Sequence, residues 1–227
     1  MPELVLERVG KRYGPAQVLR NVDCALTRGV VTLVTGGNGA GKSTLLKIMA
    51  GLSRPSSGRV LLRPESGAPG PEPRLGYVGH ATFLYPDLTA LENLAFWRTA
   101  HQLRLERDAL LALLERVGLA DHAHERARVF SRGMAQRLNL ARVLMLAPDI
   151  LLLDEPATGL DAPSRGLLRR EIAAARERGA CVALVSHDLA GDAPLADRVL
   201  ALARGAVTYD GPAAAFFAPE GARACCA

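Results

Sequence analysis

Gly36-Gly37-Asn38-Gly39-Ala40-Gly41-Lys42-Ser43-Thr44 is the stretch of sequence that decides the fold. The apolar run 30–34 in front of it is typical of a buried strand, and residues 42–49 are typical of a helix. The glycines therefore lie at a strand-to-helix turn, where backbone N–H groups can approach phosphate oxygens and the helix adds the positive end of its dipole. This pattern predicts a phosphate-binding loop rather than a glycine-rich turn without a ligand.

Every residue of the stretch 36–44 is a candidate nucleotide contact. We expect Gly36, Gly39 and Gly41 to adopt backbone conformations that are closed to other residues. Lys42 is expected to reach the β- and γ-phosphates, and Ser43 to place its hydroxyl on Mg²⁺. The sequence therefore predicts binding of a magnesium–nucleotide complex.

Two adjacent carboxylates, Asp154 and Glu155, follow the hydrophobic run 150–153. A strand that ends there places both at the carboxyl edge of the sheet, beside the phosphate loop. Asp154 is the candidate Mg²⁺ ligand, through the water shell of the ion, and Glu155 the candidate group that polarises the attacking water. For the pair alone, a polar strand end that leads into a turn at Pro156 is a reasonable alternative. It does not suit a pair that ends an apolar strand in a phosphate-loop protein.

A helix is predicted to begin at Ser131, which is a favourable N-cap residue. Residues 134, 138, 141 and 145 are apolar and fall on one face of that helix. Its first turn would present the Ser131 hydroxyl and the N–H groups of Arg132 and Gly133 to an anion. A plain capped helix is the alternative if the segment is considered alone.

Residues 130–137, Phe-Ser-Arg-Gly-Met-Ala-Gln-Arg, resemble the signature motif of ATP-binding cassette (ABC) ATPases, usually written Leu-Ser-Gly-Gly-Gln. Ser131 and Gly133 match that motif, whereas Phe130, Arg132 and Met134 depart from it. The resemblance extends from about Leu4 to Gly211 and makes Ser131 and Gly133 candidate nucleotide contacts.

Further motifs of this family follow in the same order along the chain. Thr158-Gly159-Leu160-Asp161 resembles the D-loop, in which Asp161 would contact the opposite subunit. His187 follows the apolar run 182–185, after Ser186, and resembles the switch histidine that touches the γ-phosphate and orders the attacking water. Lys11-Arg12-Tyr13-Gly14 resembles the A-loop, whose ring stacks on adenine. A surface histidine and an edge-strand tyrosine are the alternatives for these two side chains.

His80 stands where these ATPases usually carry a glutamine that touches Mg²⁺ or its water and senses the transmembrane partner. A neutral imidazole can accept a hydrogen bond or ligate a metal, and it titrates near neutral pH. His80 is therefore a candidate metal-site and coupling residue.

The fold class expected from strands that alternate with helical stretches is α/β with a mainly parallel sheet. The resemblance implies the P-loop NTPase fold of ABC ATPases: a mostly parallel sheet core, an antiparallel β subdomain and an α-helical subdomain. We expect a single nucleotide-binding domain over 1–227, with 1–80 and 136–227 forming the core and β subdomain and 81–135 the helical subdomain.

The resemblance also implies partners. Two copies would pair head to tail with ATP, each nucleotide lying between Lys42 of one copy and Ser131 of the other. Separate transmembrane permease subunits would rest near His80 and the helical subdomain, which places the chain peripherally on the cytoplasmic face of the bacterial inner membrane.

The most specific prediction concerns the transported substrate. The run 78–94 and the signature segment resemble the ATP-binding subunit of the haem exporter of cytochrome c maturation. Small exporters of drugs, lipids or polysaccharides share much of the pattern and remain alternatives. Soluble ABC ATPases that act on nucleic acid or ribosomes carry an inserted coiled coil or a second cassette, and this sequence has neither, so no nucleic acid partner is expected. Because Lys42, Asp154, Glu155 and His187 are all present, a purely binding module is rejected.

Composition agrees with these predictions. The 227 residues are 49% hydrophobic with a formal net charge of +5, and no uninterrupted apolar run of membrane-spanning length or signal peptide is seen. Cys24 and Cys181 lie in apolar runs and are expected to be buried thiols, whereas Cys225 and Cys226 are taken as a disordered end. The basic residues of 165–178 alternate with acidic ones, which indicates a solvated helix face.

Overall fold

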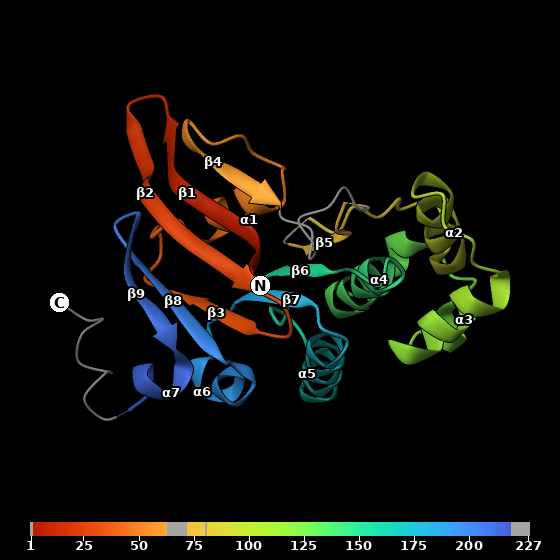
Figure 1. Cartoon of the computed structure of the whole chain (residues 1–227). Coiled ribbons are helices and arrows are strands. Elements are labelled where there is room, and N and C mark those ends of the chain that lie inside the picture. Colours follow the sequence, from red (N-terminus) through yellow and green to blue (C-terminus); the bar gives the residue numbers. More distant parts are fainter. Residues whose placement is uncertain (1, 63–71, 80, 219–227) are drawn as a thin grey trace.

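Two β-sheets form the body of the computed structural model, which describes residues 2–62, 72–79 and 81–218 (Figure 1). The larger sheet has the order β5-β6-β7-β3-β8-β9, and only its edge strand β9 runs antiparallel to its neighbour. Its strands are β3 (Val31–Thr35), β5 (Leu75–Val78), β6 (Ile150–Asp154), β7 (Cys181–Val185), β8 (Arg198–Ala203) and β9 (Ala206–Pro212). The predicted α/β fold with a mostly parallel sheet is confirmed.

The smaller sheet is antiparallel, with the order β2-β1-β4. Its strands are β1 (Pro2–Tyr13), β2 (Ala16–Thr27) and β4 (Ser57–Leu62). Helix α1 (Lys42–Met49) packs with apolar residues of this sheet against one face of the parallel sheet, and these residues form one of the two apolar cores. The second core lies on the opposite face of the parallel sheet.

Every residue of β3, β6 and β7 is buried, because apolar side chains cover both faces of these central strands. The covering helices of the second core are α4 (Arg132–Leu144) and α5 (Ala162–Glu177). Helices α2 (Ala90–Ala100) and α3 (Arg107–Arg116) lie beside α4, away from both sheets (Figure 1). Short helices complete the chain: 3-10 turns Ala120–His122, Ala127–Val129 and Ala193–Leu195, α6 (Leu189–Asp192) and α7 (Ala213–Phe216).

The buried side chain of Asn93 fixes the entry to the helical region. It is 0% exposed, accepts a hydrogen bond from Tyr85 N and donates to the carbonyls of Tyr85, Leu88 and Thr89. Thr89 caps α2 reciprocally with Glu92, so the loop before the helix is held at both ends. The loop backbone thus finds its hydrogen-bond partners inside the protein.

We expect Asn93→Ala to lower the free energy of unfolding by roughly 2 to 4 kcal/mol, because several buried backbone groups lose their partner. Urea titration followed by circular dichroism measures the change. Thr99→Ala, at an exposed position of the same helix, is the matched control and should shift stability by less than about 0.5 kcal/mol. Equal effects of the two variants would contradict the role of Asn93.

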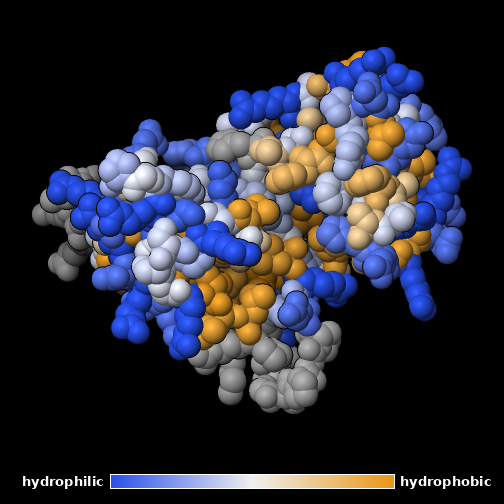
Figure 2. Space-filling view, turned by 90° about the horizontal axis from the view of Figure 1, so that it is seen from above, coloured by the Kyte–Doolittle hydropathy of each residue, from blue (hydrophilic) through white to orange (hydrophobic). Residues whose placement is uncertain are grey.

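The surface is polar over most of the face seen from above, with hydrophobic side chains gathered toward its middle (Figure 2). Among the described residues, no helix combines the length and apolar character needed to span a bilayer. Cys24 and Cys181 are buried, as predicted, and burial raises the pKa of the Cys24 thiol to about 12. Both thiols are therefore structural. Cys225 and Cys226 lie outside the described residues.

The prediction that the charged residues of 165–178 form a solvated helix face is wrong for part of α5. Glu171 is buried, and Arg116 of α3 forks onto both of its carboxylate oxygens. Arg169 is engaged by two carboxylates from another element. Charge alternation alone did not reveal that other elements pack against this helix.

Candidate functional site

The turn between β3 and α1 has the backbone of an anion-binding loop. Gly36, Gly39 and Gly41 all have positive φ, as predicted, and Gly41 is the left-handed N-cap of α1 without a side-chain cap. A Cβ at Gly37 or Gly39 would meet no atom within 4 Å, so the loop has open space beside its backbone. The described geometry leaves the first N–H groups of α1 available to phosphate oxygens.

Lys42 lies at the first position of α1 and is only 7% exposed. Its Nζ donates to the carbonyl oxygens of Gly36 and Gly37, at 2.7 and 3.0 Å. The ammonium is thus held inside the turn formed by the loop itself. Phosphate oxygens entering this turn would meet a charge that is already in place.

Ser43 and Asp154 connect the loop to the edge of the parallel sheet. Ser43 Oγ donates to Asp154 Oδ1 at 2.9 Å, and Tyr77 Oη donates to Asp154 Oδ2 at 3.3 Å. Asp154 is 1% exposed, and burial together with this carboxylate raises the pKa of Tyr77. A hydroxyl oxygen and a carboxylate oxygen are donors that Mg²⁺ prefers, so these residues fit the ion.

Glu155 follows β6 in a left-handed conformation, with φ of 52°. Its N–H donates to the carbonyl of Val185, which places it beside the end of β7. Its Oε1 lies 2.7 Å from His187 Nε2, and both side chains line a pocket of about 400 Å³. At Glu155 the backbone leaves the strand in this strained conformation, and the side chain lies toward His187. Strained backbone of this kind is often found at functional sites.

Ser131 caps α4, because its Oγ accepts from Met134 N at 3.2 Å. A Cβ at Gly133 would approach Gly159 O and Leu160, so the start of α4 lies against the segment 158–161 of the same chain. Asp161 caps α5 by accepting from Ser164 N at 3.0 Å, and this hydrogen bonding lowers the pKa of Asp161. The signature segment and the segment 158–161 thus each lead into a capped helix, and they contact each other.

Tyr13 lies at the end of β1, beside the turn of the β1–β2 hairpin, and the residue is 52% exposed. Lys11 Nζ lies 4.8 Å from the ring centroid. The same hairpin reaches the phosphate loop, since a Cβ at Gly41 would meet Val18 O and Leu19. An exposed ring on this hairpin is available for stacking. His80 lies outside the described residues.

The part played by Tyr77 at this site was missed. Tyr77 pairs with Leu152 across parallel strands, which places it on the same face of the sheet as Asp154. The alternation of residues along each strand would have predicted this contact only if the pairing register had been known.

The family model described as ABC transporter matches residues 19–158. The aliphatic sulfonates import ATP-binding protein SsuB of Burkholderia thailandensis is 38% identical over 91% of the chain, but the chain spans only 60% of that relative's length. The glutamine transport ATP-binding protein GlnQ of Escherichia coli is 34% identical over 90% of this chain and 89% of its own.

Two solved structures have the same fold. An ATP-binding subunit of an ABC transporter superposes with a TM-score of 0.81 at 26% identity, covering 92% of this chain and 89% of that one. An ATP-binding cassette of an ABC transporter in its ADP conformation superposes with a TM-score of 0.79 at 21% identity, covering 99% and 98%.

Proposed function

Because this chain belongs to the ABC transporter family, we propose that it is an ATP hydrolase that powers a membrane transporter through separate permease subunits. One observation carries the proposal. The Ser43–Asp154 bond and the Glu155–His187 contact bring the glycine-rich loop, a candidate metal-binding carboxylate and a candidate base to one edge of the parallel sheet. These are the parts that phosphoryl transfer to water requires.

In this mechanism the loop 36–44 and the N-terminus of α1 bind the phosphates, and Lys42 neutralises their charge. Ser43 and Asp154 would hold Mg²⁺, which would supply further positive charge to the phosphates when bound. Glu155 takes a proton from the attacking water. At the same time the water oxygen bonds to the γ-phosphorus, and the bond from the γ-phosphorus to the oxygen that bridges to the β-phosphate breaks, which releases ADP. His187, 2.7 Å from Glu155, orients the water and the γ-phosphate.

The oligomer is also part of the proposal. Two copies pair head to tail with ATP, so that Ser131 and Gly133 of one copy face the loop of the other and Asp161 crosses the interface. Tyr13 stacks on adenine. The core with its β subdomain comprises 1–80 and 136–227, and the helical subdomain 81–135 carries the signature segment. His80 links the metal site to the permease, whose presence would place the chain at the cytoplasmic face of the cell membrane.

Purification of the tagged chain from detergent-solubilised membranes of its native host tests the partner assignment. A multi-span membrane protein in stoichiometric amount, with Mg²⁺-dependent ATPase activity in the preparation, is the expected result. Recovery with ribosomes or nucleic acid and without a membrane protein would overturn the transporter assignment.

We propose haem as the cargo and export as the direction of transport, because the run 78–94 and the signature segment resemble the haem exporter subunit. Uptake is the second candidate, favoured by relatives whose names specify import of aliphatic sulfonates and transport of glutamine. Export of drugs, lipids or polysaccharides remains a further alternative from the sequence pattern.

Deletion of the gene distinguishes these cargoes. If the chain powers haem export, the deletion strain should lose covalently bound haem in its c-type cytochromes, and wild-type protein should restore it where Glu155→Gln does not. Normal cytochromes, together with lost growth on sulfonates or glutamine, would replace haem export by uptake.

A further inference from the structure

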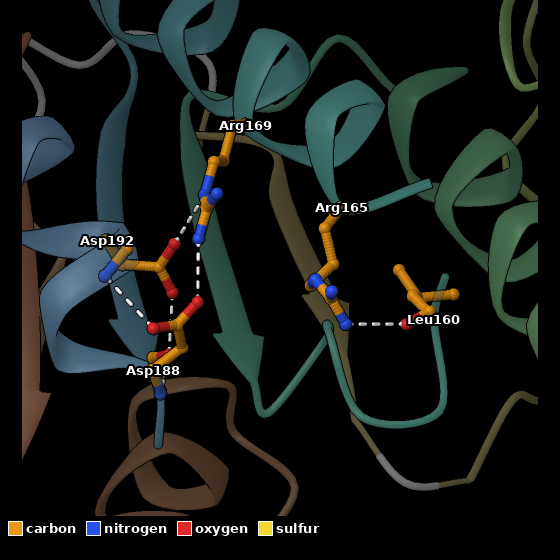
Figure 3. Close-up of polar contacts among 7 residues, drawn as sticks. Leu160, Arg165, Arg169, Asp188 and Asp192 are labelled. Carbon is orange, nitrogen blue, oxygen red and sulfur yellow. Dashed lines mark hydrogen bonds and ion pairs between the residues drawn. The ribbon is translucent and has the colours of Figure 1, made fainter. Parts of the chain in front are cut away.

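Two arginines one turn apart on α5, Arg165 and Arg169, contact the two loops that flank the 400 Å³ pocket (Figure 3). Arg165 Nη1 donates to the carbonyl of Leu160 at 2.9 Å, in the loop before α5. Arg169 points instead to the segment that follows β7 and contains His187. One rigid helix therefore touches both loops.

Arg169 joins two carboxylates. Its Nη2 donates to Asp188 Oδ2 and its Nε donates to Asp192 Oδ1, each at 2.9 Å. Asp192 also accepts from Ser186 Oγ at 2.6 Å, and Ser186 Oγ accepts from Asp188 N at 3.0 Å. The residues immediately before and after His187 are thus both held in one hydrogen-bonded network.

Because Asp192 is buried, the network depends on Arg169. Asp192 is only 6% exposed, and its carboxylate receives a neutral donor from Ser186 and a charged one from Arg169. A buried carboxylate that loses its cationic partner reorients or becomes costly to keep charged. Loss of Arg169 would therefore release the Ser186 contact as well as the Asp188 contact.

We propose that Arg169 is a positioning residue, which holds the segment 186–188 on α5 so that His187 stays 2.7 Å from Glu155. The arrangement also has a consequence for the dimer. Because Asp161 caps α5 and Arg165 binds Leu160, movement of the loop 158–161 at the proposed interface moves the helix that sets His187. The inference rests on the proposed ATPase function and adds a residue that lies outside the sequence motifs.

Arg169→Gln tests the proposal in the full-length protein. We expect kcat for ATP hydrolysis to fall roughly 10- to 100-fold, because small displacements of catalytic groups have effects of this size. KM for ATP should stay within about twofold, since the phosphate loop is untouched. Arg170→Gln, the adjacent exposed arginine, is the matched control and should leave both constants unchanged.

Three further variants separate positioning from stability. In Arg169→Gln/Asp192→Asn the buried charge is removed, so thermal stability should recover while kcat stays low. In Gly191→Ala the added methyl would meet the Arg169 guanidinium and the Asp188 carboxylate, so kcat should fall although neither charged residue is changed. Arg169→Lys, which can reach one carboxylate at a time, should give an intermediate kcat.

Three outcomes would overturn the proposal: an unchanged kcat in Arg169→Gln, a rise in KM without a fall in kcat, or full recovery of kcat in the double variant. Absence of ATPase activity in the wild-type protein would instead contradict the proposed function. The two failures are therefore distinguishable.

Discussion

Replacement of Glu155 by Gln is expected to lower ATP turnover by roughly 10²- to 10⁴-fold while ATP still binds. The amide has nearly the shape of the carboxylate but cannot take a proton from water. Binding should persist because the loop and Lys42, which is held by the carbonyls of Gly36 and Gly37 and would contact the phosphates, are unchanged. Steady-state phosphate release and equilibrium binding of labelled ATP measure the two quantities separately.

The same variant should accumulate as an ATP-bound dimer that separates with ADP, which light scattering can follow. Glu177→Gln, at an exposed position of α5, is the control and should retain wild-type turnover. Near-normal hydrolysis by Glu155→Gln would remove Glu155 from the role of base. A molecular mass that is independent of the nucleotide would count against dimerisation by ATP.

The sequence was most informative where local rules determine structure. Helix α1 spans Lys42–Met49 as predicted, and Ser131 caps α4 as predicted. A glycine-rich turn, an N-cap and an apolar strand each depend on neighbouring residues, so their patterns can be recognised without the fold. The glycine-rich strand-to-helix turn and the strand that ends at Asp154 could therefore be placed from sequence.

Contacts between distant segments were not predictable in this way. Arg169 reaches Asp188 and Asp192 only because α5 packs beside the end of β7, and a charge pattern on one helix does not specify its neighbours. Asn93 was missed for a related reason. Its value lies in four hydrogen bonds to a loop whose path is set by the packing of α2. Side chains that join elements are identified only when those elements have been placed.

The proposed head-to-tail dimer predicts that two inactive variants restore each other. Lys42→Ala removes the charged phosphate contact, and Ser131→Asp places a negative charge where the partner's phosphate would lie. Asp is as good an N-cap as Ser, so the start of α4 should be preserved. Each variant alone should lose ATPase activity by at least about 100-fold, as loss of a charge-stabilising group at a reacting centre does. Ser131→Asn is the control, because it caps the helix without adding charge.

Mixing the two variants gives dimers with one doubly altered site and one site that combines Lys42 of one copy with Ser131 of the other. Activity should therefore return on mixing, in proportion to the heterodimers measured by native mass spectrometry. If each site were completed within a single chain, every copy would carry a defect and the mixture would stay inactive. Heterodimers without recovered hydrolysis would thus reject the shared site, whereas recovered hydrolysis requires that Ser131 acts on the nucleotide of its partner.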